Sequence, residues 1–357
     1  MIKYIILLET GLGNQIMSYC LWHHLVYQQK QKAILYCKKD VGLNNIFKNT
    51  MPMMYSKWYI DGCIFFEKVL NRLEKILCKV ELVKYFPVKV VRFPYWENYH
   101  FIKDIEDLNY IFRFPQLDGK NQEIANFMRK TNSVSIHVRR GDYQKVLFWR
   151  VLLGDICEKE YYDKAISRVE ELVENPVYFI FSDEIEWVKQ NLKIKDGIYI
   201  DWNYGMDSYK DMYLISCCKC NICANSTFSL MSTWFNNNPN PIRIVPTKWL
   251  NQHDDLLFAK YIPDDNWIPI DNKRPTISIF VKSKLSRTEL NYILSQTYSD
   301  FELFLIKNNT AVLIDDRIKQ DSEPTGRFIL KVQDPICFRK KNYLRYWIEE
   351  RLSKKTV

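Results

Sequence analysis

The sequence predicts an α/β protein with parallel sheets and crossover helices. Short apolar runs alternate along the chain with longer stretches of helical periodicity, which is the pattern of strands joined by helices. Apolar residues make up 47% of the 357 residues, enough for large packed cores and too many for a disordered chain. Because a typical domain has about 150 residues, a chain of this length should form roughly two domains.

The apolar runs are the expected strands. They lie at residues 2–8, 32–37, 133–138, 177–182, 197–201, 221–226 and 242–246. A long amphipathic helix is expected at residues 64–84, with lysine and glutamate between its apolar positions. Its apolar face comprises Phe66, Val69, Leu70, Leu73, Ile76, Leu77 and Val80. We expect that face to pack on a domain, and contact with a membrane surface is the alternative.

Two polar breaks divide the chain. Residues 113–124 contain proline and glycine and predict a boundary between two α/β halves, and residues 263–275 separate a smaller third piece. We therefore expect an N-terminal domain at 1–120, a second domain at 121–270 and an appendage at 271–357.

Composition also bears on the compartment. The first apolar run, Tyr4 to Leu8, is shorter than the roughly 7–15 apolar residues of a secretory signal, and no window approaches the ~18 of a membrane helix. A chain of this length does not need disulfide bonds between its ten cysteines to be stable. These features favour a protein of the reducing cytoplasm, in solution or peripheral at the inner face of the membrane.

A cysteine cluster occupies residues 217–223, with the sequence CCKCNIC. It contains a single Cys-x-x-Cys, and no further pair has the spacing of zinc ligands. We expect these side chains to be small buried hydrophobes at the junction of a helix and a strand, and we expect no metal site.

The net charge is +9, from 51 basic and 42 acidic residues. Such an excess suits a polyanion, a phosphorylated small molecule or an anionic membrane surface. Nucleic-acid binding is disfavoured because the basic residues are scattered instead of alternating with aromatic residues along one groove.

The first candidate site segment directly follows the first strand. It contains Gly11, Gly13, Asn14 and Gln15 before a helix that should begin near Ile16. Glycines there allow a ligand to approach the backbone at a helix N-terminus. A dinucleotide fingerprint would need a third glycine in place of Ile16, so that interpretation is disfavoured. A plain tight turn is the alternative, although two amides at a sheet edge favour a ligand site.

The second segment ends the strand at residues 133–138. His137 and Arg139 share one face because they are two residues apart, and Arg140, Gly141 and Asp142 follow. A guanidinium is permanently charged and presents a planar fork to phosphate oxygens, so Arg139 and Arg140 suit a diphosphate. The alternative is a solvated basic loop.

The third segment lies where the strand at 221–226 meets a helix. Asn225, Ser226, Thr227, Phe228 and Ser229 offer hydroxyls and backbone N–H groups of the kind that bind anions, although a simple N-cap is the alternative. Further polar candidates are Ser182 and Asp183, after the strand at 177–182, and Asp211.

Taken in order, these segments resemble the α-1,2-fucosyltransferases of glycosyltransferase family 11. The matching words are GLGNQ at 11–15, YWENYHF at 95–101, HVRRGDY at 137–143, EYYDKAI at 160–166, FSDE at 181–184, DMYLIS at 211–216, ANSTFS at 224–229 and PTKW at 246–249. Each word is short, but their common order over residues 5–250 is specific. Thr10 stands where the family usually has a second glycine, and Leu230 and Met231 replace its usual aromatic pair.

The resemblance implies a GT-B architecture of two Rossmann-like domains facing a cleft. It implies inverting transfer of L-fucose from GDP-fucose, with no metal or other cofactor. Arg139 and Arg140 would stabilise the departing diphosphate, with Ser226, Thr227 and Phe228 completing the cradle.

Further roles also come from the resemblance. His137 and Asp211 resemble groups that bind the guanine and ribose, and Asn14 resembles a residue between donor sugar and acceptor hydroxyl. The remaining donor-binding candidates are Asn225, Ser229, Ser182 and Asp183. Asp142 is the candidate general base, although a carboxylate beside two arginines is a weak one.

The third piece, residues 275–357, resembles the opening strand, helix and strand of glycosyltransferase family 2. Lys307, Asn308 and Asn309 replace that family's nucleotide-binding aspartate, so we expect a truncated appendage without its own active site. Its basic tail, 339–355, has apolar residues on one helical face, for which internal packing and membrane contact are equally open.

The expected partners are GDP-fucose and a galactose-containing surface glycan such as an O-antigen or capsule, free or lipid-linked. The acceptor should contact the loops at 42–63 and 144–157. The alternatives are a transferase for another GDP-sugar or linkage, and a non-catalytic module that binds a glycan or nucleic acid.

Overall fold

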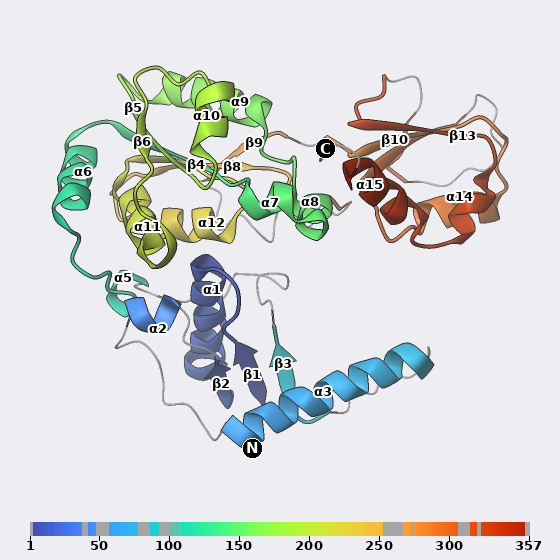
Figure 1. Ribbon diagram of the computed structural model, residues 1–357, viewed down its shortest axis with the longest axis horizontal. Coiled ribbons are helices and arrows are strands. Elements are labelled where there is room, and N and C mark those ends of the chain that lie inside the picture. The colour runs from blue at the N-terminus through green and yellow to red at the C-terminus, as the bar shows by residue number, and fades with distance from the viewer. Residues whose placement is uncertain are drawn as a thin grey trace.

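The computed structural model describes residues 3–37, 42–47, 57–77, 86–92, 102, 105, 108–252, 267–272, 274–305, 315–319 and 323–353. Within these ranges the chain forms three parallel sheets, each with its own strands (Figure 1). The expected α/β class with parallel sheets is confirmed. The sheets draw on residues 4–91, 133–270 and 277–332.

The N-terminal unit is built on a sheet with strand order β2-β1-β3. Its strands are β1 (Tyr4–Leu7), β2 (Ala33–Tyr36) and β3 (Lys89–Val91). Its helices are α1 (Leu12–His23), α2 (Gly42–Ile46) and α3 (Lys57–Leu77). A short helix, α5 (Leu108–Ile111), leads out of this unit. The two expected strands at 2–8 and 32–37 are therefore present.

The middle unit contains a six-stranded sheet of order β6-β5-β4-β7-β8-β9. Its strands are β4 (Ser133–Val138), β5 (Val177–Ser182), β6 (Ile198–Ile200), β7 (Cys220–Ile222), β8 (Ile242–Pro246) and β9 (Trp267–Ile270). Counted in chain order within this sheet, the strands run 3-2-1-4-5-6, the order of a Rossmann sheet. The direction of the strand order reverses between β4 and β7, and such a switch point is where open α/β sheets bind ligands.

Seven helices in the described part of the middle unit precede, connect or follow these strands. They are α6 (Gly119–Lys130), α7 (Gly141–Lys145), α8 (Leu147–Leu153), α9 (Lys159–Leu172), α10 (Ile185–Asn191), α11 (Ser208–Cys217) and α12 (Thr227–Trp234). Two sequence expectations need correction here. β9 lies inside the polar break expected at 263–275, and β7 ends at Ile222, so the expected strand at 221–226 mostly forms a turn. Pro269 does not prevent β9 from pairing with β8, because β9 is an edge strand.

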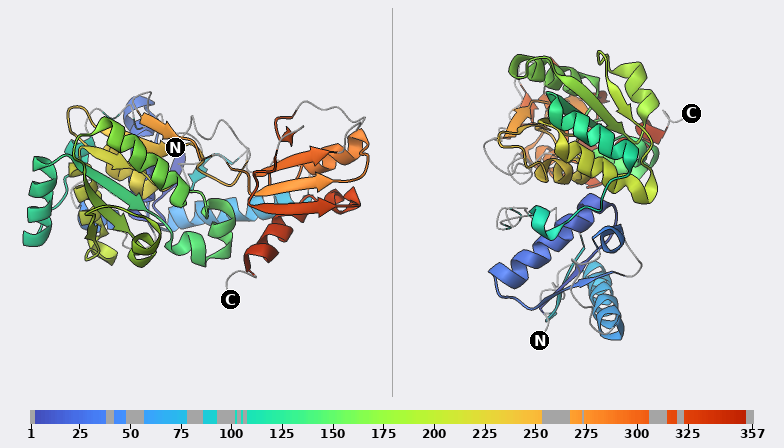
Figure 2. Two further views of the ribbon diagram at one scale, coloured as in Figure 1. Left: turned by 90° about the horizontal axis from the view of Figure 1, so that it is seen from above. Right: turned by 90° about the vertical axis from the view of Figure 1, so that its left-hand side faces the viewer.

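The C-terminal unit is a four-stranded sheet of order β12-β11-β10-β13. Its elements are β10 (Ile277–Val281), α14 (Arg287–Leu294), β11 (Phe301–Leu305), β12 (Ile318–Lys319), β13 (Phe328–Val332) and α15 (Tyr343–Ser353). The expected strand, helix and strand are thus present, whereas residues 307–309 lie outside the described residues. This unit lies beside the middle unit, next to α8 (Figures 1 and 2). In α15, Leu344, Ile348 and Leu352 are buried in its core, so the apolar face of the tail packs internally.

The long helix buries a different face from the one expected. Ile60, Ile64 and Glu67 are buried in α3, whereas Phe66 is 54% and Leu73 40% exposed. Glu67 turns inward because Arg92, just after β3, forms a two-pronged ion pair with it at 2.7 and 2.9 Å. A pattern that treats every glutamate as solvent-facing cannot anticipate that pair. No helix in the described ranges combines the length and apolar character needed to cross a membrane.

The cysteines of the cluster are buried at the junction of a helix and a strand, as expected. Cys217 ends α11, Cys220 begins β7, and both are buried together with Cys218 and Cys223. All four are free thiols. They contribute small apolar side chains to the cores of the middle unit.

The N-terminal and middle units meet through α1 and α12. Ile16 and Met17 of α1 share one buried cluster with Leu230 and Met231 of α12. Gly13 makes this approach possible, because a Cβ atom there would lie 2.6 Å from the Phe228 backbone nitrogen. Leu230 and Met231 are therefore part of the contact between the units.

Replacing Gly13 by alanine tests this contact. Helix propensity alone predicts a gain of about 1 kcal/mol. The clash with the Phe228 backbone instead predicts a net loss of about 1–3 kcal/mol, because backbone cannot move aside as a side chain can. Thermal and denaturant unfolding measure the difference.

Gly11→Ala is the matched control in the same turn. Nothing lies within 4 Å of a Cβ at Gly11, so its effect should stay below about 1 kcal/mol. A Gly13→Ala protein as stable as the control would show that α1 and α12 do not meet in this way.

Candidate active site

A cavity of about 650 Å³ lies at the carboxyl ends of the middle unit's strands. It is lined by residues that follow β4, β5, β6, β7 and β8, and its opposite side is formed by residues 10–14 of the N-terminal unit. The expected cleft between two α/β units is therefore present. Arg139 follows β4 and Ser226 follows β7, so the cavity includes the switch point of the sheet.

A hydrogen-bonded chain of side chains joins the two sides of the cavity. The Thr227 hydroxyl donates to Asn14 Oδ1, and Asn14 Nδ2 donates to Thr10 Oγ1 at 2.6 Å. Thr10 has a φ of 67°, a left-handed conformation that is unfavourable for a β-branched residue. Gln15 Nε2 donates to the Thr10 carbonyl at 2.6 Å and stabilises this turn from behind. Asn14 is consequently fixed at the point where the units meet.

The N-termini of α1 and α12 converge at the same place. Their N-cap residues, Gly11 and Ser226, place no side-chain oxygen on the first N–H groups of either helix. The first N–H groups of a helix have no intrahelical acceptor and carry the positive end of the helix dipole. Two such ends facing one cavity form a binding site suited to an anion.

Arg139 contributes its charge beside these helix ends. Its guanidinium forms ion pairs with Asp142 at 2.7 Å and Asp183 at 2.9 Å. Gly141 allows Asp183 to reach it, because a Cβ at Gly141 would lie 2.5 Å from Asp183 Oδ2. The two carboxylates hold the guanidinium in a fixed orientation in the cavity.

Four expected donor-binding or turn residues do not line the cavity. The Arg140 guanidinium lies over the Trp187 ring, 3.8 Å from its centroid, so the expected arginine pair is reduced to Arg139. Asn225 donates to the carbonyls of Leu153 and Trp249.

Ser229 and Gln15 are the other two expected residues that do not line the cavity. Ser229 Oγ accepts from the Ala224 N–H at 3.1 Å. Gln15 is buried, and its Oε1 accepts from the Leu43 N–H at 3.0 Å. These side chains hold the loops that form the cavity, and they are directed away from it.

The remaining expected site residues do line the cavity. They are Gly11, Gly13, Asn14, His137, Arg139, Asp142, Ser182, Asp183, Asp211, Ser226, Thr227 and Phe228. Among them, Ser182 accepts from the Glu184 N–H at 2.9 Å and shapes the turn that carries Asp183.

His137 and Asp211 have displaced pKa values. Burial lowers the pKa of His137 to about 4, so its imidazole is neutral near pH 7. Its ring lies 5.4 Å from the Phe228 ring, and its Nδ1 is buried without a hydrogen-bond partner among the described residues. Burial raises the pKa of Asp211 to about 7, against the opposing hydrogen bond from Asn203 Nδ2 at 2.7 Å. Both side chains are poised to bond with an uncharged polar group of a ligand.

The charges around the cavity are not those expected from the sequence. The lining, all of it in the described part of the chain, holds one guanidinium and four aspartates. The aspartates are Asp142, Asp183, Asp201 and Asp211. The lining is therefore acidic overall, and an anion would find its positive partners only at Arg139, whose charge is offset by Asp142 and Asp183, and at the two helix ends.

Several lining residues were not anticipated. Tyr143 lies under Arg139, with the guanidinium 5.5 Å from its ring, and Trp149 and Trp249 add aromatic side chains to the lining of the cavity. Asn203 joins Asp211 to Asn121 at 3.0 Å. Tyr143 and Trp249 end the words HVRRGDY and PTKW, so the motifs contained a signal for them. Nothing in a single sequence distinguishes Trp149 or Asn203. The motif at 95–101 lies outside the described residues.

Comparisons with known proteins agree with the motifs. The model of glycosyl transferase family 11 matches residues 81–271. The α-1,2-colitosyltransferase of Escherichia coli is 35% identical over 292 residues, which cover 74% of this chain and 97% of that protein. The chain belongs to glycosyl transferase family 11.

More distant similarities accompany these. Galactoside α-(1,2)-fucosyltransferase 2 of Gorilla gorilla gorilla is 23% identical to this family 11 chain, covering 72% of each protein. Among solved structures, the fucosyltransferase NodZ from Bradyrhizobium has a TM-score of 0.36 at 14% identity and covers 65% of this chain and 92% of NodZ.

The raised pKa of Asp211 predicts a pH-dependent stability in this family 11 transferase. A carboxyl whose folded pKa lies above its unfolded value stabilises the fold while both states are protonated, and this contribution is lost as pH rises toward the folded pKa. The loss should occur between about pH 4 and pH 7, from the ordinary value of 3.8 to the raised value of about 7.

Asp211→Asn removes the ionisable group with little change of shape and can still accept from Asn203. We expect similar melting temperatures for variant and wild type at pH 4.5, and a more stable variant at pH 8. Thermal melts at the two pH values measure this. A difference that does not change with pH would contradict a raised pKa.

Proposed function

We propose that this family 11 enzyme transfers L-fucose from GDP-fucose to the 2-hydroxyl of a galactoside in a surface glycan, with inversion and without a metal. The acceptor is a galactose-containing glycan, free or lipid-linked, met in the cytoplasm or at the inner face of the membrane. The observation that carries the proposal is the convergence of Arg139 with the N-termini of α1 and α12 on one cavity between two α/β units.

Departure of GDP is the step that this geometry assists most directly. Negative charge grows on the diphosphate as the glycosidic bond breaks, so a fixed positive group stabilises the transition state more than the ground state. Arg139 and the N–H groups that begin α12 are placed to provide it. Ser226 adds a hydroxyl that can donate to the diphosphate, whereas the Thr227 hydroxyl donates to Asn14 and holds the two sides of the cavity together.

Metal independence is supported by the partners of Arg139. Asp142 and Asp183 line the cavity beside Arg139, and both are ion-paired to its guanidinium. A permanent cation thus stands where a divalent cation would otherwise bind. Asp142 is engaged in this ion pair, which favours a role in orienting Arg139 over a role as general base.

Two groups of lining residues differ in chemistry and suggest how the substrates lie. His137, Asn203 and Asp211 offer polar groups for the base and ribose of the nucleotide. Trp149 and Trp249 offer aromatic faces of the kind that contact sugar rings. Asn14 lies at the meeting point of the units, where donor sugar and acceptor hydroxyl would approach each other.

GDP-colitose is a second candidate donor. It is favoured because a 35% identical relative, aligned over 74% of this chain, is named an α-1,2-colitosyltransferase. Colitose is L-fucose without its 3-hydroxyl. An apolar wall such as that of Trp149, Leu153 and Leu250 discriminates weakly between two sugars that differ by one hydroxyl, whereas a hydrogen bond to the 3-hydroxyl would discriminate strongly.

A donor and acceptor panel tests the function. Purified protein is incubated with GDP-fucose, GDP-colitose or GDP-mannose and with a set of galactosides, in EDTA, and the product linkage is determined by NMR. We expect a 1,2-linked fucoside of inverted anomeric configuration. Preference for GDP-colitose would establish the second donor. Binding of a glycan without turnover of any donor would contradict the transferase assignment.

Arg139→Ala tests the stabilisation of the leaving group. Loss of a charged donor to the developing negative charge should lower kcat/KM for GDP-fucose by at least about 100-fold. Steady-state kinetics with a melting curve for each variant measure it.

Arg140→Ala is the control, because this arginine is adjacent in sequence but stacks on Trp187 outside the cavity. We expect it to lower kcat/KM by less than about 5-fold. Equal losses in the two variants would contradict the separate placement of the two arginines.

A further inference from the structure

Two segments of the chain, residues 149–153 of α8 and residues 248–250, lie between the active-site cavity and a second cavity. We call them the wall segments. Trp149 and Leu153 of α8 line the first, whereas Arg150 and Val151 line the second. In the other segment, Trp249 and Leu250 line the first, whereas Lys248 lines the second. The second cavity, of about 750 Å³, lies between the middle and C-terminal units. Each wall segment therefore has one side toward the active site and the other toward the C-terminal unit.

The C-terminal unit holds the α8 segment by packing. Val151 is 6% exposed and belongs to the core cluster of the C-terminal unit, together with Leu344, Ile348 and Leu352 of α15. Arg150 Nη1 donates to the Leu352 carbonyl at 3.4 Å. One turn of α8 is thus part of a core that belongs to another unit.

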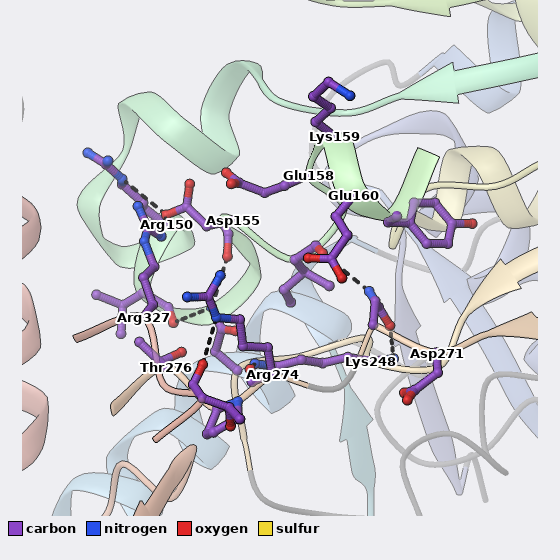
Figure 3. A pocket seen from close by; sticks show the side chains of 18 of the residues that line it. Arg150, Asp155, Glu158, Lys159, Glu160, Lys248, Asp271, Arg274, Thr276 and Arg327 are labelled. Carbon is purple, nitrogen blue, oxygen red and sulfur yellow. Dashed lines mark hydrogen bonds and ion pairs between the residues drawn. The ribbon is translucent and has the colours of Figure 1, made fainter. Parts of the chain in front are cut away.

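Buried ion pairs with the C-terminal unit hold both wall segments. Figure 3 shows the charged side chains of both units around the second cavity. Asp155, which follows α8, is ion-paired to Arg327 at the start of β13, and its side chain is 7% exposed. Lys248 Nζ lies 2.8 Å from Asp300 Oδ2 and donates to the Arg274 carbonyl at 2.6 Å. Removing one partner of a buried pair leaves the other charge uncompensated, so these contacts strongly favour one arrangement.

The two segments are also joined to each other. Asn251 Nδ2 donates to the Val151 carbonyl at 3.2 Å and to the Gly154 carbonyl at 2.9 Å, and its N–H donates to the Leu152 carbonyl at 2.8 Å. A displacement of one segment is therefore passed to the other.

We propose that the C-terminal unit is a positioning element of the transferase, which fixes the aromatic wall of the active site through the Asp155–Arg327 pair and the packing of Val151. It acts on the aromatic wall that carries Trp149 and Trp249, whereas Asn203 and Asp211 line the active-site cavity only and not the second cavity. The proposal rests on the proposed function, because it assigns that aromatic wall to the sugar and its acceptor.

Arg327→Glu in the full chain tests the proposal, with Lys331→Glu as the matched control. Arg327 directly precedes β13 and Lys331 lies on it, and the charge change is the same, but Lys331 is exposed and does not line the second cavity. We expect Arg327→Glu to raise KM for the acceptor or lower kcat by at least 5-fold while the Kd for GDP stays within 2-fold. Hydrogen exchange of residues 147–154 should become faster. Lys331→Glu should match wild type in all of these.

A double-mutant cycle of Asp155→Asn and Arg327→Met covers the case in which Arg327→Glu fails to fold. The double variant should lose no more than the worse single variant, because the two side chains act through each other. Additive losses would overturn the proposal, as would acceptor kinetics and hydrogen exchange that do not distinguish Arg327→Glu from Lys331→Glu.

The exchange measurement also separates this proposal from the proposed function. If wild type transfers no sugar from any donor, but Arg327→Glu still increases exchange at 147–154, the proposed function fails and the positioning of the wall holds. If transfer is found and exchange and acceptor KM are unaffected, the positioning role fails and the function holds.

Discussion

The structure depends on the contact of two helix N-termini across a cleft. α1 and α12 come from different α/β units, yet Gly13 lies so near the Phe228 backbone that no side chain fits between them. The buried cluster of Ile16, Met17, Leu230 and Met231 supports this approach. Because both helices direct unbonded N–H groups to the same cavity, the packing of the units and the binding of an anion are consequences of one arrangement.

This arrangement explains how a cavity with four aspartates can suit a diphosphate. The positive groups, namely the guanidinium of Arg139 and the helix ends, are concentrated where the leaving group would lie. Asp142 and Asp183 orient the guanidinium, and Gly141 permits that contact. A fixed local field of this kind acts on developing charge without further rearrangement, which is the property that catalysis of group transfer requires. The chain's net charge of +9 contributes little to this account.

The sequence predicted the features that depend on local interactions, and it missed those that depend on partners distant along the chain. β4 and β5 have the predicted bounds, and His137 and Arg139 line the cavity as predicted, because strand periodicity is a local property. The face of α3 could not be predicted, since Glu67 is buried by an ion pair with Arg92, 25 positions along the chain. Arg140 was misplaced because its partner, Trp187, comes from α10. Trp149 was missed because α8 gains its position from the C-terminal unit, which no local pattern reveals.

In the function that we propose, the diphosphate of the nucleotide is held between Arg139 and the N-terminus of α12. A crystal structure of the full chain with GDP tests it most directly. We expect diphosphate oxygens about 3 Å from backbone N–H groups at the start of α12 and from the Arg139 guanidinium, with the nucleoside toward Asn203 and Asp211. GDP bound elsewhere, or with its diphosphate away from both groups, would contradict it.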